Sequence, residues 1–390
     1  IGSTAGYNAQ GINTVAIGYR AGYNAQDGSS VAIGIESGES AQGASATAVG
    51  RTSGRFNQGD YGTAVGQGAG TTSQGANSVA VGLNAGVTVQ GTNSVAIGNQ
   101  GGKTSQGAQG VAIGLTAGMT SQGINGVAIG TEAGMSEQGA QGVAIGQNAG
   151  RGEQGANATA VGRQAAQNIQ GDYATAVGYQ AGYTSQANYS VAVGHQTGLS
   201  EQGPNALAIG DRSGGTSQGT GAVAVGYTAG DTEQGNQSIA IGTLAGGTAQ
   251  LGYAVAIGRE AAQETQGYQA VAMGYRAAEN DQGTQGVAIG VTAGQHVQSD
   301  YGISIGTESG QSAQGENAVA VGRRSGRYNS GLSAVAMGYY AGYNTQGQTA
   351  TAVGGLAGAY NQGNDAVAVG YTAGATAQAA YSVAIGREAG

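Results

Sequence analysis

The side chains that most often carry chemistry are scarce in this chain and are widely spaced. The 390 residues include two histidines, His195 and His296, and no cysteine. The chain repeats every 16 residues, so about six copies, or roughly 30 Å of stacked strands, separate the two histidines, too far for one metal or acid–base site. A nucleophile, a base and an orienting residue never recur together. The sequence therefore predicts no catalytic site, no metal site, no cofactor and no enzyme activity.

Single aspartates recur along the chain, as at Asp60, Asp172 and Asp300. Scattered aspartates occur in calcium-binding β-rolls, but those proteins carry the nonapeptide Gly-Gly-x-Gly-x-Asp-x-x-x, which is absent here. The neighbouring opposite charges of Arg259-Glu260 and Arg387-Glu388 are explained as surface ion pairs. The acidic residues thus predict no calcium site.

Arginine and tyrosine side chains are the best candidates for contact with another molecule. An exposed tyrosine offers a large contact area for proteins or sugars at low entropic cost, although it can also simply cover a strand edge. Five tyrosines recur at one position of the repeat, and three arginines form the densest basic cluster. The candidate outer contact residues are Tyr179, Tyr227, Tyr275, Tyr339, Tyr371, Arg323, Arg324 and Arg327.

The elements that must position these side chains follow from the internal repeat. Motifs similar to Val-Ala-Ile-Gly start at Val15 and at every sixteenth residue up to Val383, which makes 24 copies without an insertion or deletion. We number repeat positions from the first residue of this motif, so residues 95–98 occupy positions 1 to 4. Position 4 is always Gly, and position 8 is Gly in nearly every copy, which indicates regular turns or close backbone approaches. The remaining segments of about three to five residues have strand lengths and are too short for helices.

The apolar residues of the motif alternate along the strand. Positions 1 and 3 are β-branched or aliphatic almost throughout, and a spacing of two places them on one face, which we expect to form the core. Position 12 is Gln in every copy except at Ser330, and stacked amides can hydrogen-bond along an axis as a ladder. The residues assigned to the core are Val95, Ile97, Val111, Ile113, Gln106 and Gln122.

The opposite face of the motif is a strip of small residues. Positions 16, 2 and 4 carry no charged or large residue in any copy, whereas a solvent-exposed face would drift toward polar side chains. A long strip of this kind normally packs against something, and the simplest partner is a second copy of the chain, because equal repeats keep register. The residues assigned to this chain–chain interface are Ser94, Ala96, Gly98, Ala112 and Ala128.

Together the elements predict an all-β fold: a parallel β-solenoid of about 24 coils, continuous over residues 1–390, that associates side by side with copies of itself. The 81 glycines, one proline and one phenylalanine exclude a core of large side chains. The single lysine, Lys103, argues against nucleic acid as a partner, and no apolar run long enough to span a membrane is present in this segment. Because Ile1 already lies inside a repeat, we expect the chain to be a segment of a longer fibre protein.

The motif Ser-Val-Ala-Ile-Gly at residues 94–98, with Gly101 at the position that Ala117 fills in the next copy, resembles the head repeat of YadA-type trimeric autotransporter adhesins. The resemblance covers all 24 copies. It implies a left-handed parallel β-roll, a homotrimer, and adhesion to host surface proteins, matrix or glycans. It also implies that Val95 and Ile97 lie in each chain's core, with Ser94 and Ala96 toward the trimer axis. The family repeat is typically shorter, and similar 16-residue arrays also resemble fibre proteins of phages and large viruses.

The function expected from these features is a structural or adhesive segment of an extracellular homotrimeric fibre, on a cell surface or a virion. The alternative is an ice-binding β-solenoid, in which flat columns of threonine face the ice. Position 10 is Thr in nine copies but also holds Phe56, His296 and Tyr328, and this irregularity weakens the alternative.

Overall fold

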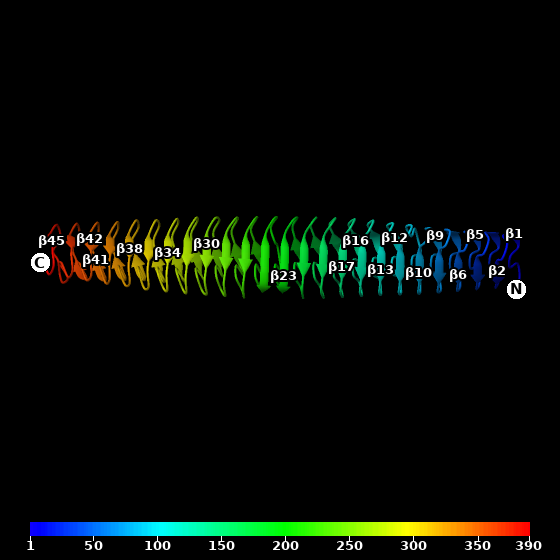
Figure 1. Ribbon diagram of the computed structural model, residues 1–390, viewed down its shortest axis with the longest axis horizontal. Coiled ribbons are helices and arrows are strands. Elements are labelled where there is room, and N and C mark those ends of the chain that lie inside the picture. Colours follow the sequence, from blue (N-terminus) through cyan, green and yellow to red (C-terminus); the bar gives the residue numbers. More distant parts are fainter. The chain divides into compact units, whose positions relative to one another are not determined.

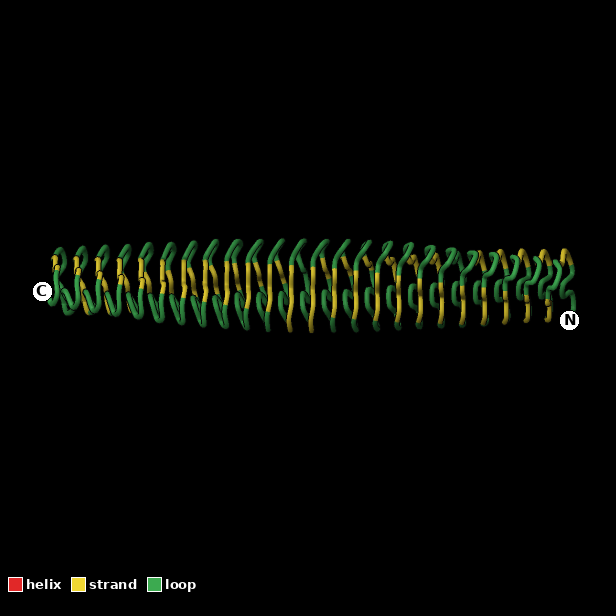
Figure 2. Tube along the Cα trace, in the orientation of Figure 1, coloured by secondary structure: helices red, strands yellow, loops and turns green.

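The computed structural model describes all residues from 1 to 390, which fall into two compact units, residues 1–196 and residues 197–390. Each unit is a parallel β-solenoid in which one coil takes 16 residues, so the predicted all-β solenoid fold is confirmed. Figure 2 shows strands and loops only. The structure has no helix that could cross a membrane. The prediction of one continuous domain over residues 1–390 stays a prediction.

In unit 1, the coils build two parallel sheets. The motif sheet contains the strands that begin at position 1: β2 (Val15–Ile17), β4 (Val31–Ile33), β6 (Thr47–Val49), β8 (Thr63–Val65), β10 (Val79–Val81), β11 (Val95–Ile97), β13 (Val111–Ile113), β15 (Val127–Ile129), β17 (Val143–Ile145), β19 (Thr159–Val161), β21 (Thr175–Val177) and β23 (Val191–His195). The glutamine strands end at position 12: β1 (Asn8–Gln10), β3 (Asn24–Gln26), β5 (Ser40–Gln42), β7 (Phe56–Gln58), β9 (Thr72–Gln74), β12 (Thr104–Gln106), β14 (Thr120–Gln122), β16 (Ser136–Gln138), β18 (Glu153–Gln154), β20 (Ile169–Gln170) and β22 (Ser185–Gln186).

Unit 2 repeats this arrangement. Its motif sheet contains β24 (Leu207–Asp211), β26 (Val223–Val225), β28 (Ile239–Ile241), β30 (Val255–Ile257), β32 (Val271–Met273), β34 (Val287–Ile289), β36 (Ile303–Ile305), β38 (Val319–Val321), β40 (Val335–Met337), β42 (Thr351–Val353), β44 (Val367–Val369) and β45 (Val383–Ile385). Its glutamine strands are β25 (Ser217–Gln218), β27 (Glu233–Gln234), β29 (Ala249–Gln250), β31 (Thr265–Gln266), β33 (Asp281–Gln282), β35 (Val297–Gln298), β37 (Ser312–Gln314), β39 (Tyr328–Ser330), β41 (Asn344–Gln346) and β43 (Tyr360–Gln362).

Successive coils of a unit pair in register, and Figure 1 shows their strands as stacked arrows. Between β11 and β13, for example, Ala96 pairs with Ala112. The amide of Val95 donates to the carbonyl of Gly110 at 2.8 Å, which continues the parallel ladder at the start of the strand. Because residues 16 apart become neighbours, equal repeat positions stack on one another, and each position forms a column along its unit.

The interior of a coil is lined by small residues rather than by branched ones. Ser94, Ala96, Ala112 and Ala128 are fully buried within a single chain. Their assignment to a chain–chain interface is therefore wrong: they are small because they face the inside of the coil. Gly98 lies in the bend after β11 and is half-buried.

The branched residues of positions 1 and 3 lie on the outward face of the motif sheet. Val95, Ile97, Val111 and Ile113 are each only partly buried, so their assignment to the core is wrong as well. The cause is the narrow interior. A Cβ placed on Gly118, at position 8, would lie 3.1 Å from the Cβ of Ala112, which is closer than ordinary van der Waals contact. The methyl group of Ala112 thus fits opposite a glycine, and a branched side chain would not.

Candidate interaction surfaces

Inside each coil, the position 12 glutamine joins the two sheets. The amide nitrogen of Gln122 donates to the carbonyl of Val111 at 2.8 Å and to that of Gly126 at 3.1 Å. It also lies 3.0 Å from the side-chain oxygen of Gln138 in the next coil. Gln106 and Gln122 are almost completely buried, at 1% and 2% exposure. This column therefore holds the coil together and is not accessible to a ligand.

The outward face of the motif sheet carries what we call the apolar stripe, the side chains of positions 1 and 3. Position 3 is aliphatic or Met in every copy, and in-register pairing makes these side chains contiguous along each unit. Ile129 and Ile289 are each 37% exposed, and Met337 is 43% exposed. A long contiguous apolar surface is uncommon on a solitary soluble protein and marks an interaction site.

The five tyrosines predicted as outer contacts lie on the surface. Tyr227, Tyr275, Tyr339 and Tyr371 are exposed, and Tyr179 is half-buried. Each has an arginine guanidinium over its ring, a favourable cation–π geometry. The pairs and their distances to the ring centroid are Arg163–Tyr179 (4.8 Å), Arg212–Tyr227 (5.1 Å), Arg276–Tyr275 (5.4 Å), Arg323–Tyr339 (5.9 Å) and Arg387–Tyr371 (5.9 Å). Part of each tyrosine surface is thus covered by its own chain.

The basic cluster of residues 323–327 is organised by one carboxylate. Glu308 accepts from Nε of Arg324 at 2.8 Å and lies 2.9 Å from Nη2 of Arg327. The hydrogen bond from Arg324 lowers the pKa of Glu308 below its usual value, and charge attraction by Arg327, Arg324 and Arg323 adds to this effect. Arg323 is not part of this network of ion pairs and is exposed. Arg324 and Arg327 are therefore held by Glu308, whereas Arg323 faces solvent.

Tyrosines that the sequence interpretation did not single out complete this surface. Tyr340 and Tyr343 follow Arg324 and Arg327 by 16 residues and accept hydrogen bonds from them. Tyr328 and Tyr360 flank them on the neighbouring coils, with their rings 5.5 and 5.8 Å from that of Tyr343. The signal that would have found Tyr340 and Tyr343 is the 16-residue offset, which places each of them in the same column as an arginine.

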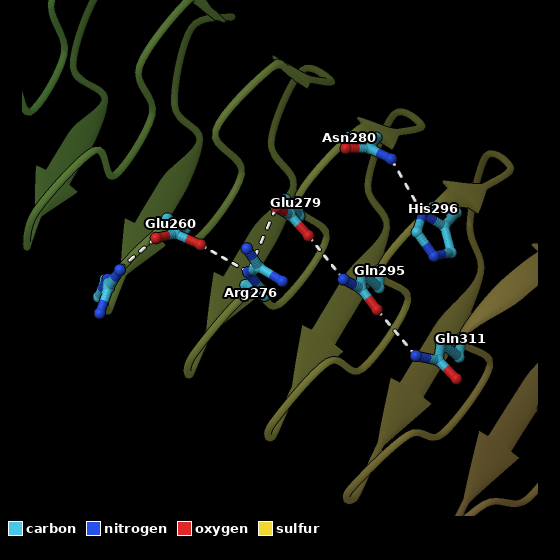
Figure 3. Close-up of polar contacts among 8 residues, drawn as sticks. Glu260, Arg276, Glu279, Asn280, Gln295, His296 and Gln311 are labelled. Atoms are coloured by element: carbon cyan, nitrogen blue, oxygen red, sulfur yellow. Dashed lines mark hydrogen bonds and ion pairs between the residues drawn. The ribbon is translucent and has the colours of Figure 1, made fainter.

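A polar ladder leads along unit 2 toward this cluster, and Figure 3 shows its contacts. Arg276 donates to Glu260 at 2.6 Å and lies 3.4 Å from Glu279, which accepts from Gln295 at 2.6 Å. Gln311 then donates to the side-chain oxygen of Gln295 at 2.8 Å. The next rung is the hydrogen bond from Nε of Arg327 to Gln311, at 2.7 Å. Arg327 is therefore held from two sides.

The aspartates and histidines that could carry out chemistry contact other groups of the same chain. Asp60, Asp172 and Asp300 each accept a hydrogen bond from a backbone amide of the preceding coil, at 2.9, 2.8 and 2.7 Å. His296 lies 3.0 Å from the side-chain amide of Asn280, and His195 stacks on a tyrosine at 5.4 Å. No group of three or more His, Cys, Asp or Glu side chains is placed to hold a metal ion.

Comparison with known proteins bears on the repeat itself. The family model described as YadA head domain repeat (2 copies) matches residues 58–85, 73–100, 170–197 and 362–389. None of the curated proteins matches the chain. The matched segments share the 16-residue coil described above, with its small interior and outward apolar positions. This chain carries YadA-like head repeats.

Proposed function

We propose that this chain is a structural and adhesive segment of an extracellular homotrimeric fibre, and that three copies associate through the apolar stripe. In this arrangement the small-residue columns fill each coil, and the branched residues of positions 1 and 3 cover one another between chains. The chain then works by holding binding surfaces in place and not by catalysis.

The apolar stripe is the observation that carries the proposal. Its side chains are large enough to stabilise an interface, and a single chain leaves a substantial part of their apolar surface exposed to solvent. Covering a Val or Ile side chain that is about one third exposed stabilises by roughly 0.5 to 1 kcal/mol, and the gain recurs in every coil. Three as the number of chains is supported by the family resemblance, since YadA-type adhesins are trimeric.

Cysteine cross-linking tests the placement of the interface, because the natural chain has no cysteine. Ile289→Cys puts a thiol on the stripe, and we expect a trifunctional maleimide to join it into a covalent trimer. Val297→Cys is the matched control, because Val297 is 48% exposed but belongs to the glutamine strand β35. The control should stay a single chain. Equal cross-linking of both variants, or of neither, would refute the proposed interface.

A further inference from the structure

A continuous patch of aromatic rings lies on unit 2 around the basic cluster. We call it the tyrosine patch, and its members are Tyr328, Tyr339, Tyr340, Tyr343 and Tyr360. The rings of Tyr339 and Tyr340 are 4.5 Å apart, and those of Tyr340 and Tyr343 are 4.8 Å apart. With the contacts of Tyr343 to its two flanking rings, all five form one connected surface over three coils.

The patch is fixed by charged groups beneath and beside it. Arg324 lies 5.3 Å from the centroid of Tyr340, and Arg327 lies 4.8 Å from that of Tyr328. Both guanidiniums are tied to Glu308, and Arg327 is also tied to the polar ladder through Gln311. Because the rings are held in place before any partner arrives, binding would cost little side-chain entropy.

The patch also differs in charge from the rest of the chain. The whole chain has 21 acidic and 13 basic residues, yet three arginines stand within residues 323–327 against one paired carboxylate, Glu308. Tyr339 and Tyr360 are 52% and 42% exposed, and Arg323 is exposed beside Tyr339. The surface therefore offers flat apolar faces, phenolic hydroxyls and a guanidinium that can pair with an anion.

We propose that the tyrosine patch, with Arg323, binds an acidic oligosaccharide. Tyrosine rings stack on the apolar faces of sugar rings, their hydroxyls hydrogen-bond to sugar hydroxyls, and Arg323 pairs with a carboxylate or sulfate group. Neither a neutral sugar nor an apolar peptide segment would supply an anion to pair with the positive charge of Arg323. The inference rests on the proposed adhesive function and names its ligand class.

Calorimetric titration of the full chain tests this with three probes: a sulfated heparin oligosaccharide, a hyaluronan oligosaccharide that carries only carboxylates, and an uncharged cello-oligosaccharide. We expect binding of at least one acidic probe and none of the neutral one. Binding of heparin alone identifies sulfate as the recognised group, and binding of hyaluronan alone identifies carboxylate. Failure of both acidic probes, or equal binding of the neutral probe, overturns the proposal.

Variants locate the binding to the patch. Tyr340→Ala with Tyr343→Ala should weaken it by about tenfold or more, as loss of aromatic anchors usually does. Tyr173→Ala with Tyr189→Ala is the matched control, because this pair stacks at 5.1 Å in unit 1 without an arginine over either ring, and it should bind as the natural chain does. Equal losses in both double variants overturn the assignment.

Arg323→Gln gives a second readout that keeps all five rings of the patch and removes only the guanidinium beside Tyr339. It should weaken binding of the acidic probe and reduce its dependence on salt; unchanged affinity and salt dependence would contradict the role of Arg323. The solution mass separates this inference from the proposed function. A trimer that ignores acidic glycans refutes the glycan site alone, whereas a monomer that binds them refutes the trimer alone.

Discussion

Gln122 shows how much of a coil depends on one buried side chain. Its amide nitrogen serves two carbonyls and the next glutamine. We expect Gln122→Ala to leave these acceptors without that donor and to destabilise the local coils by about 1 to 3 kcal/mol. Amide hydrogen exchange is the suitable measurement, because repeat proteins open locally, and protection should fall around β13 and β14. Gln147→Ala, at an exposed position 5, is the control; similar loss of protection in both variants would contradict the role of the column.

Gly130 and Gly134 show two different reasons why a glycine occupies its position in the repeat. Gly130, at position 4, has φ of +127°, and a Cβ there would lie 2.7 Å from the carbonyl oxygen of Gly146 in the next coil. We expect Gly130→Ala to destabilise its coil by roughly 1 to 3 kcal/mol or more. Gly134, at position 8, has φ of +50°, and that position already accepts alanine at Ala166. Gly134→Ala should reduce hydrogen-exchange protection distinctly less than Gly130→Ala does. Equal losses of protection would show that the close backbone approach at position 4 is not what requires glycine there.

Among the elements of unit 2, the polar ladder ends on Glu308. Protonation of the Glu308 carboxylate should loosen the arginine cluster. The pKa of Glu308 lies below its usual value because Arg324 donates to it. The stabilising contribution is therefore complete above the unfolded-state pKa of about 4.3 and is lost as the pH falls through the lowered folded-state pKa.

The natural chain and Glu308→Gln should consequently differ most in hydrogen-exchange protection of β36 to β39 near neutral pH, and the difference should shrink below about pH 4. Glu316→Gln, which removes another carboxylate of the same stretch, should show a smaller difference at neutral pH. A Glu308→Gln effect that stays constant down to low pH would contradict the ionic role of this residue.

The strands illustrate what the sequence can and cannot predict. The 16-residue period, the strands of the motif and the inward glutamine column follow from residue columns alone. The alternation of Val95, Ala96 and Ile97 tells which residues share a face, because side chains alternate along a strand. It does not tell which face is inside. That depends on how closely the rest of the coil approaches the motif strand. The contact of Ala112 with the turn at Gly118 shows that this approach is close, and no single strand encodes it.

The tyrosine patch was only partly predictable for a related reason. Arg323, Arg324, Arg327 and Tyr339 stand out as a cluster or as members of a regular column. Tyr343 meets Tyr328 and Tyr360 only when coils stack, because these two neighbours lie 15 and 17 residues away in sequence.

For the whole molecule, the narrow interior of the coil changes which residues favour self-association. The small-residue columns are explained inside one chain, so they no longer call for a partner. The outward Val and Ile residues do, because they recur in register along both units while remaining about one third exposed. We therefore infer that copies of the chain cover one another's apolar stripe.

The most direct test of that claim is the mass of the natural chain in solution, measured by sedimentation equilibrium at several concentrations. We expect a single species of three times the 37.6 kDa chain mass. Replacing Ile289 and Ile305 of the stripe with Glu should shift this species toward smaller masses, because a charge would be buried in the interface. A natural chain that sediments as a stable 37.6 kDa monomer at all concentrations would contradict association through the apolar stripe.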